Sequence, residues 1–141
     1  MSQQQTLAII KPDAVRNKTA GKILSMIENS GLAITGAKMV RLTRELAGEF
    51  YAVHKGKPFY EELLDFMSSG HCIVLVLSGE EAIVKWRELM GATNPEKAAE
   101  GTIRKLYGTH VQWNACHGSD APETARQEVS FFFSGAELLQ K

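Results

Sequence analysis

Four short apolar stretches, separated by amphipathic segments, constrain the fold of this 141-residue chain more than any other feature. The first stretch alternates and is rich in β-branched residues, and the third is the most strongly apolar part of the sequence. Short runs of this kind, bounded by Gly and Pro, are typical of strands. The pattern predicts strands over residues 6–10, 33–42 and 71–77, and a fourth from about Val111 that leads to His117.

The segments between these strands show the three- to four-residue spacing of helices. We predict a helix start at Pro12-Asp13 and a last helix capped by Asp120 with Pro122 in its first turn. The other helices are expected over residues 20–29, 43–54, 59–67 and 79–90, with an irregular stretch from 91 to 108. This order interleaves two split βαβ units. It favours an α+β sandwich of ferredoxin-like type, with a four-stranded antiparallel sheet and helices packed on one face.

Length and composition exclude several classes of protein. A chain of 141 residues is expected to form a single domain over residues 1–141. The formal net charge is zero, so no overall field attracts nucleic acid or an anionic membrane. No apolar run reaches the length of a membrane span, and the first residues lack a signal pattern. The two cysteines form no CxxC pair, and we expect a cytoplasmic protein.

The segment NACHGSD, residues 114–120, is the strongest candidate for chemistry. Its central residue, His117, stands between a small residue and a glycine, just before a helix start. A neutral imidazole is both a nucleophile and a proton acceptor near pH 7. Cys116 is a second candidate nucleophile, but strand alternation turns its side chain away from that of His117, which favours a core position.

Three cations stand at unusual places and could bind a polyphosphate together. Lys11 ends the first strand, Arg87 lies near the end of a helix of core residues, and Arg104 follows a Gly-Thr turn. The sequence has neither a GxxxxGK[ST] loop nor a GxGxxG turn, so side chains must hold the phosphates. Taken singly, each cation is also compatible with a solvated surface position.

Six blocks in their order resemble the nucleoside diphosphate kinases. Beside NACHGSD they are TLAIIKPDAV (6–15), KPFY (57–60), GATNP (91–95), GTIR (101–104) and FFSGAEL (132–138). The resemblance runs from about residue 5 to residue 139. It implies transfer of the terminal phosphate of a nucleoside triphosphate, usually ATP, to nucleoside diphosphates by a ping-pong route through a phosphohistidine.

The resemblance also assigns roles to single residues. His117 is the nucleophile through Nδ1, Glu128 orients its ring, and Ser119 supports that carboxylate. The phosphates are expected to meet Lys11, Arg87, Thr93 and Arg104, with Tyr51, a further catalytic candidate, close by and Asn114 at the ribose 3′-hydroxyl. The base is expected to stack on Phe59, beside Leu63 and Val111. Mg²⁺ should be carried by the nucleotide phosphates rather than by a cage of carboxylates, with Asp120 acting on it through water.

Other interpretations remain open at this level. A non-catalytic ferredoxin-like binding module would carry aromatic residues on its central strands, and AII (8–10) and VLV (74–76) carry none. An inactive scaffold is a further alternative, although every catalytic position is filled. A zinc site is not expected, because His54, His71 and His110 show no metal-ligand spacing. The short C-terminus resembles bacterial members, and we expect a homo-oligomer, either tetramer or hexamer, with no specific nucleic-acid partner.

Overall fold

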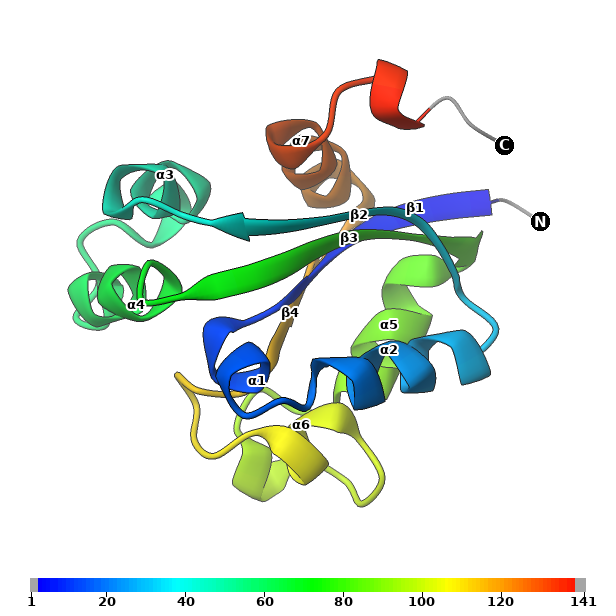
Figure 1. The fold of residues 1–141 in the computed structure, drawn as a ribbon, viewed down its shortest axis with the longest axis horizontal. Helices are drawn as coiled ribbons and strands as arrows, with labels where there is room; N and C mark the ends of the chain where they lie inside the picture. Colours follow the sequence, from blue (N-terminus) through cyan, green and yellow to red (C-terminus); the bar gives the residue numbers. More distant parts are fainter. Residues whose placement is uncertain (1–2, 139–141) are drawn as a thin grey trace.

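The computed structural model describes residues 3–138 and contains a four-stranded antiparallel sheet. Its strands are β1 (Gln3–Ile10), β2 (Ala33–Arg41), β3 (His71–Glu80) and β4 (Cys116–Gly118). They lie in the order β2-β3-β1-β4, so the first and third strands occupy the centre (Figure 1). This arrangement confirms the predicted ferredoxin-like α+β fold.

Helices cover both faces of the sheet, which corrects the expectation of a single covered face. Side chains alternate across a strand, and in β1 both sets are apolar: Leu7 and Ile9 point to one face, Ala8 and Ile10 to the other, and all four are fully buried. Each face therefore needs its own cover. One face packs against α3 (Arg44–Phe50), α4 (Tyr60–Met67) and α7 (Pro122–Phe132). The other packs against α1 (Pro12–Arg16), α2 (Ala20–Asn29), α5 (Ala82–Met90) and α6 (Ile103–Tyr107).

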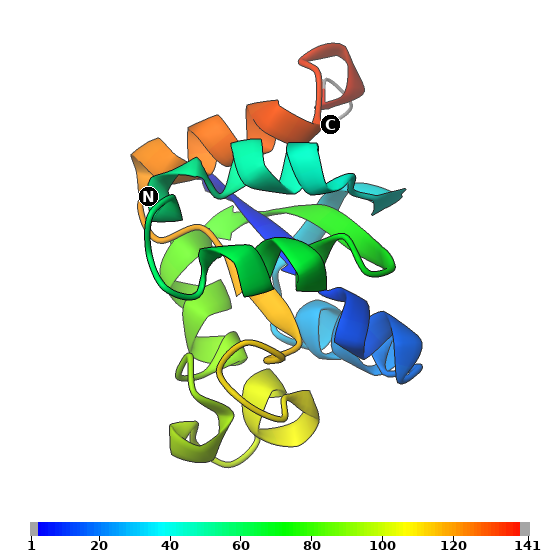
Figure 2. The same cartoon turned by 90° about the vertical axis from the view of Figure 1, so that its left-hand side faces the viewer.

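The views agree with this division. In Figure 2, α3 and α7 lie at the top, while α1, α2 and α6 lie at the bottom. Three short 3-10 turns complete the described elements: η1 (Ala52–His54), η2 (Pro95–Lys97) and η3 (Ala136–Leu138). Within residues 3–138, no helix is long and apolar enough to cross a membrane.

The fourth strand is much shorter than predicted, and the prediction of a strand from Val111 was wrong. Residues before Cys116 form a loop that folds on itself, in which the Thr109 amide donates to the Trp113 carbonyl at 2.8 Å. Ala115 then adopts a left-handed backbone, with φ of 77°. A strand cannot run through such a residue, because extended chain requires negative φ. Of this region of the chain, only Cys116, His117 and Gly118 pair with β1.

Three helices also differ from the prediction. Strand β3 continues to Glu80, and Glu81 has φ of 51°, so α5 begins at Ala82 rather than at Gly79. The 43–54 helix is α3 followed by η1, and Thr43 caps it through a hydrogen bond from the Leu46 amide. At α7 the N-cap residue is Ala121. The carboxylate of Asp120 instead accepts from the Thr124 hydroxyl at 2.6 Å.

Candidate active site

The site lies where the end of β1, the short strand β4 and the turn after α3 meet. Pairing of Ile9 with His117 fixes the histidine beside the central strand. Its ring contacts the rings of Phe50 and Tyr51, with centroids 5.3 Å and 6.0 Å away. Cys116, the neighbour in β4, is fully buried in the cluster on the opposite face. Strand alternation therefore separates the imidazole from the thiol.

Glycine is required next to His117 because a tryptophan packs against the strand. A Cβ built on Gly118 would lie 2.5 Å from Cδ1 of Trp86 and 2.6 Å from Cε of Met90. The same indole donates its Nε1 hydrogen to the His117 carbonyl at 3.1 Å. Trp86 is fully buried in the cluster that packs on the Ala8 and Ile10 face of the sheet, and from that face it fixes the backbone of β4.

One nitrogen of the His117 ring is held by a carboxylate of α7. Nε2 lies 2.9 Å from Oε1 of Glu128, and each of the two side chains is less than one-fifth exposed. An ionised carboxylate only accepts, so Nε2 carries the hydrogen and Nδ1 keeps its lone pair. The hydroxyl of Ser119 donates to the same carboxylate oxygen at 2.8 Å. Ser119 is itself fixed to β1, since its amide donates to the Leu7 carbonyl.

A buried lysine and a buried asparagine form a second pair beside the histidine. Lys11 Nζ donates to Oδ1 of Asn114 at 2.9 Å, and both residues are more than nine-tenths buried. Burial, aided by the charge of Arg104, lowers the pKa of Lys11 to about 8. The amide nitrogen of Asn114 donates to the Thr93 carbonyl at 3.0 Å. Thr93, exposed at the surface, is thereby tied to the same pair.

Arg104 is a second buried cation, fixed in place by backbone carbonyls. Its Nη1 donates to Gly91 at 3.1 Å and its Nη2 to Cys116 at 2.8 Å, while Nε has no partner among the described residues. Burial lowers the pKa of Arg104, and the nearby charge of Arg87 lowers it further. Arg87 is exposed, and the residues that line one hollow of about 440 Å³ include Arg87, Arg104 and one carboxylate, Glu88. Within residues 3–138, no carboxylate forms a salt bridge with Lys11, Arg87 or Arg104. The cluster is suited to an anion.

Tyr51 adds an unused donor to this cluster. Its hydroxyl is buried and finds no hydrogen-bond partner among the described residues. Burial is the main cause that raises the pKa of this phenol, so it stays protonated and can donate. Its ring stacks on His54, with centroids 6.1 Å apart, and His54 meets Phe59 edge-on at 5.3 Å.

The structure places the remaining predicted residues less closely together. Phe59 is half-buried at the start of α4, and Leu63 lies in the core beneath it at 5 % exposure. Val111 stands on the loop before Ala115 and is 51 % exposed, rather than on a strand beside them. Asp120 is exposed after β4 and is occupied by its bond from Thr124.

Sequence reasoning missed three residues of the site. Phe50 and His54 flank the predicted Tyr51 and touch His117 and Phe59 respectively. Asp13 contacts the site through the Ala115 amide, which donates to its carboxylate at 3.1 Å. The only signal for Asp13 was an acid at a helix start after Lys-Pro, which is common at helix N-termini.

Neither a metal cage nor a reactive thiol is present among residues 3–138. No three His, Cys, Asp or Glu side chains gather to hold a metal. Burial raises the pKa of the Cys116 thiol to about 11 and likewise that of Cys72, which leaves both as inert thiols. The polar groups gathered around Lys11 and Arg104 are mainly cations and neutral donors.

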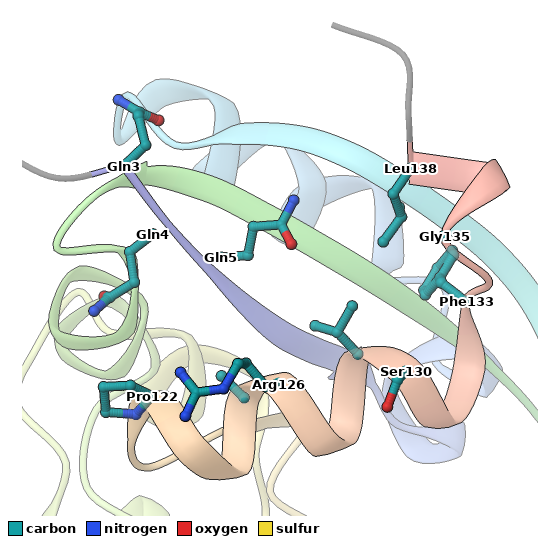
Figure 3. Close-up of a pocket in the computed structure, with 11 residues that line it drawn as sticks. Gln3, Gln4, Gln5, Pro122, Arg126, Ser130, Phe133, Gly135 and Leu138 are labelled. Atoms are coloured by element: carbon teal, nitrogen blue, oxygen red, sulfur yellow. The ribbon is translucent and has the colours of Figure 1, made fainter.

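A hollow of about 730 Å³ opens elsewhere, between the start of β1 and α7 (Figure 3). Gln3, Gln4 and Gln5 line one side, and Arg126 and Phe133 belong to the other. It contains none of the predicted site residues. The candidate site at β4 is therefore separate from this hollow.

Comparisons with known proteins identify the family of this chain. A family model described as nucleoside diphosphate kinase matches residues 4–138. The nucleoside diphosphate kinase of Persephonella marina is 53 % identical over 140 residues, which cover 99 % of this chain and 100 % of that protein. The enzyme of Syntrophotalea carbinolica is 55 % identical over 136 residues, covering 96 % and 99 %. These findings give no support to a non-catalytic module.

Solved structures show the same likeness in three dimensions. The nucleoside diphosphate kinase of Aquifex aeolicus superposes with a TM-score of 0.95 at 46 % identity, over 98 % of this chain and 100 % of that one. A halophilic nucleoside diphosphate kinase from Halobacterium salinarum, solved with CDP, gives 0.95 at 38 % identity, over 99 % and 93 %. The chain therefore belongs to the nucleoside diphosphate kinase family, enzymes that transfer phosphate between nucleotides.

Proposed function

We propose that His117 carries the phosphate between the two nucleotides as a phosphohistidine. The observation that supports this most is that only one ring nitrogen of His117 is hydrogen-bonded. Nε2 lies 2.9 Å from the Glu128 carboxylate, and Nδ1 has no hydrogen bond within the described residues. A fixed tautomer with a free lone pair is what a nucleophilic imidazole needs. One nucleotide site can then serve donor and acceptor in turn.

In the first half-reaction, the Nδ1 lone pair attacks the terminal phosphorus of a nucleoside triphosphate. A nitrogen–phosphorus bond forms while the bond to the bridging oxygen breaks, and the nucleoside diphosphate leaves with that electron pair. The Nε2 hydrogen stays on the ring and donates to Glu128, which stabilises the positive charge that develops. In the second half-reaction a terminal oxygen of another nucleoside diphosphate attacks the same phosphorus and frees the histidine.

The cationic cluster holds the phosphates during both steps. We assign Lys11 and Tyr51 to the transferring group, because Lys11 is a buried cation bonded to Asn114, and Tyr51 contacts the His117 ring and has an unused donor. Arg104 and Arg87, which share a hollow, are suited to the phosphates that stay on the leaving nucleotide. We assign Thr93, whose carbonyl accepts from Asn114, to the same phosphates. Phosphoryl transfer depends mainly on such positioning and charge stabilisation.

Asn114 is suited to the ribose. Its side chain is held at both ends, by Lys11 and by the Thr93 carbonyl, and keeps one amide hydrogen and one lone pair to spare. We assign these to the ribose 3′-hydroxyl. The base would stack on Phe59 above Leu63, with Val111 closing the slot from its loop. Stacking on a ring face reads no base edge, which suits a broad range of nucleotides.

Nucleotide kinases of this family generally need a divalent metal ion, and we propose Mg²⁺ carried by the nucleotide. The donor set fits this, since Arg87 and Arg104 line the hollow with a single carboxylate, Glu88, and no three His, Cys, Asp or Glu side chains gather to hold a metal within residues 3–138. When bound, the ion neutralises phosphate charge. Asp120, exposed after β4, is the carboxylate we expect to contact its water shell.

We further propose a single domain, a homo-oligomer of four or six chains, and a cytoplasmic location. One sheet carries both apolar clusters, which supports the single domain. Exposed apolar side chains such as Met39, Val53 and Leu106 support association. Two buried free thiols suit a reducing compartment.

Labelling with γ-³²P-ATP tests the phosphohistidine. The wild-type protein is expected to take up a label that is lost in acid and kept in base, and Glu128→Gln to take it up more slowly. His117→Ala should remain unlabelled. An equally labelled His117→Ala protein would contradict the proposal, and the unmodified circular dichroism of that variant serves as the folding control.

A further inference from the structure

Asp13 is a buried carboxylate that the phosphate-transfer steps do not use. It lies in the first turn of α1 at 6 % exposure. Its Oδ2 accepts the Ala115 amide hydrogen at 3.1 Å, across 102 positions of the chain. Burial raises its pKa, and the Ala14 amide, the charge of Lys11 and the Ala115 amide oppose the rise. A buried carboxylate aimed at one distant amide is costly unless that contact matters.

The residue that Asp13 holds is strained. Ala115 has φ of 77°, and the Cys116 amide donates to the Asn114 carbonyl at 2.9 Å, which closes a three-residue γ-turn around it. A γ-turn with positive φ is rare for a residue with a Cβ. The Ala115 carbonyl is held as well, because it accepts from the Lys11 amide at 2.9 Å. Both polar backbone groups of Ala115 are therefore fixed by the corner between β1 and α1.

This turn sets the spacing of the candidate catalytic groups. Asn114 precedes it and meets Lys11, while His117 follows it by two residues on β4. If Ala115 relaxed toward negative φ, the chain on one side of the turn would rotate relative to the other. Asn114 would then leave Lys11, or His117 would leave Glu128.

We propose that Asp13 is a positioning residue of this enzyme. Its carboxylate holds Ala115 in the left-handed conformation and so places Asn114 and His117 relative to each other. This rests on the roles proposed above for those two residues. Asp13 could instead only stabilise the N-terminus of α1. In that case, the effect of removing it would not depend on the residue at position 115.

A double-mutant comparison separates the two roles. Asp13→Ala should lower kcat/KM for phosphate exchange by about 10- to 100-fold, the effect of losing a hydrogen bond to a charged group. Glycine adopts positive φ without strain, so Asp13→Ala/Ala115→Gly should regain at least 10-fold of that loss. Asp13→Asn keeps an acceptor and should stay closer to wild type than Asp13→Ala. The matched control is Asp13→Ala/Ala98→Gly, since Ala98 has φ of −75°, and it should regain nothing.

The measurements distinguish a failure of this proposal from a failure of the proposed phosphohistidine. Exchange between ATP and CDP, and ADP affinity by calorimetry, are measured whichever group carries the phosphate. If Asp13→Ala does not fold, the rescue is measured as the fraction of folded protein that Asp13→Ala/Ala115→Gly recovers. A double variant no better than Asp13→Ala, or equal rescue by Ala98→Gly, would overturn the positioning role.

Discussion

At the scale of single residues, the most informative group is Lys11, a cation that the fold keeps out of water. Burial and Arg104 lower its pKa to about 8, against 10.5 for an unperturbed lysine. Its charge is therefore present at neutral pH and is lost in mildly alkaline solution. An ordinary lysine keeps its charge throughout this pH range, whereas the charge of Lys11 changes within it.

We predict that kcat/KM falls at alkaline pH because Lys11 loses its proton. As pH rises through about 8, the lysine loses its proton and kcat/KM should fall by about 10-fold per unit. The stability effect has the opposite sign. The unfolded chain binds more protons between about pH 8 and 10.5, so the contribution of Lys11 to the free energy of unfolding rises there. Steady-state rates from pH 6 to 9.5 check this, and the same fall in a slower Lys11→Gln enzyme would contradict it.

The Tyr51 hydroxyl is expected to lower the stability of the fold and to raise activity. Its buried hydroxyl has no partner within the described chain, and an unsatisfied buried donor costs about 1–3 kcal/mol. Tyr51→Phe should therefore raise the free energy of unfolding by about 1 kcal/mol and lower kcat/KM by about 10-fold. Urea denaturation and exchange rates measure the two effects.

The matched control for that substitution is Tyr60→Phe. The Tyr60 hydroxyl donates to the Gly48 carbonyl at 3.2 Å, so its removal should lower the free energy of unfolding by about 1 kcal/mol. Activity should stay near that of the wild type. A Tyr51→Phe protein that is less stable and fully active would show that this hydroxyl serves the fold instead.

Some single residues were predictable and others were not. Lys11, Arg104, Asn114 and His117 stood out because their motifs are short and local, and the fold brings them together. Asp13 gave no usable signal, since its partner lies 102 positions away and is a backbone amide. A contact between a side chain and distant backbone leaves no trace in residue type at the second position.

At the scale of elements, β4 is the part of the sheet on which the site depends most. It has three residues, and one of them is His117. Trp86 packs against Gly118 and bonds to the His117 carbonyl, so the helix α5 fixes the strand from one side. Pairing with β1 fixes it from the other.

Gly118→Ala should therefore damage both stability and activity. The new Cβ would meet Trp86 at 2.5 Å, and relief of such overpacking costs about 1–3 kcal/mol. The shift of β4 should also slow labelling of His117. Gly135→Ala is the control, because nothing lies within 4 Å of a Cβ there. Equal melting temperatures for the two variants would contradict this account of β4.

Element boundaries show where sequence patterns stop being informative. Residues 71–77 are apolar enough to predict a strand, but its extension to Glu80 follows from pairing with Gln3 and Gln4. The loop before Cys116 contains Val111 and Trp113, which favour strands, yet the turn at Ala115 prevents one. Tertiary pairing and a single strained residue overrode local preference there.

At the scale of the whole molecule, the fold class was predictable and the placement of helices on both faces was not. The number and order of elements favoured the ferredoxin-like topology. The assumption of one covered face failed because β1 and β3 are apolar on both faces, as Ala8 and Ile10 against Leu7 and Ile9 show. The continuous apolar run AII (8–10) already contained that information.

We predict that the protein in solution is an assembly of four or six chains. Met39 on the edge strand β2 is 60 % exposed and Val53 is 79 % exposed, and association would remove such side chains from water. Light scattering coupled to gel filtration gives the mass directly. A monomer at micromolar concentration would contradict this prediction.

The central claim is that His117 holds the phosphate between two separate half-reactions, and one pulse-chase measurement tests it. The protein is incubated with γ-³²P-ATP, freed of nucleotide, and then mixed with CDP. We predict that the isolated protein carries the label on His117 and that CDP removes it as labelled CTP within the time of one turnover. A protein that exchanges phosphate but retains no label, or a label that CDP does not remove, would contradict the account.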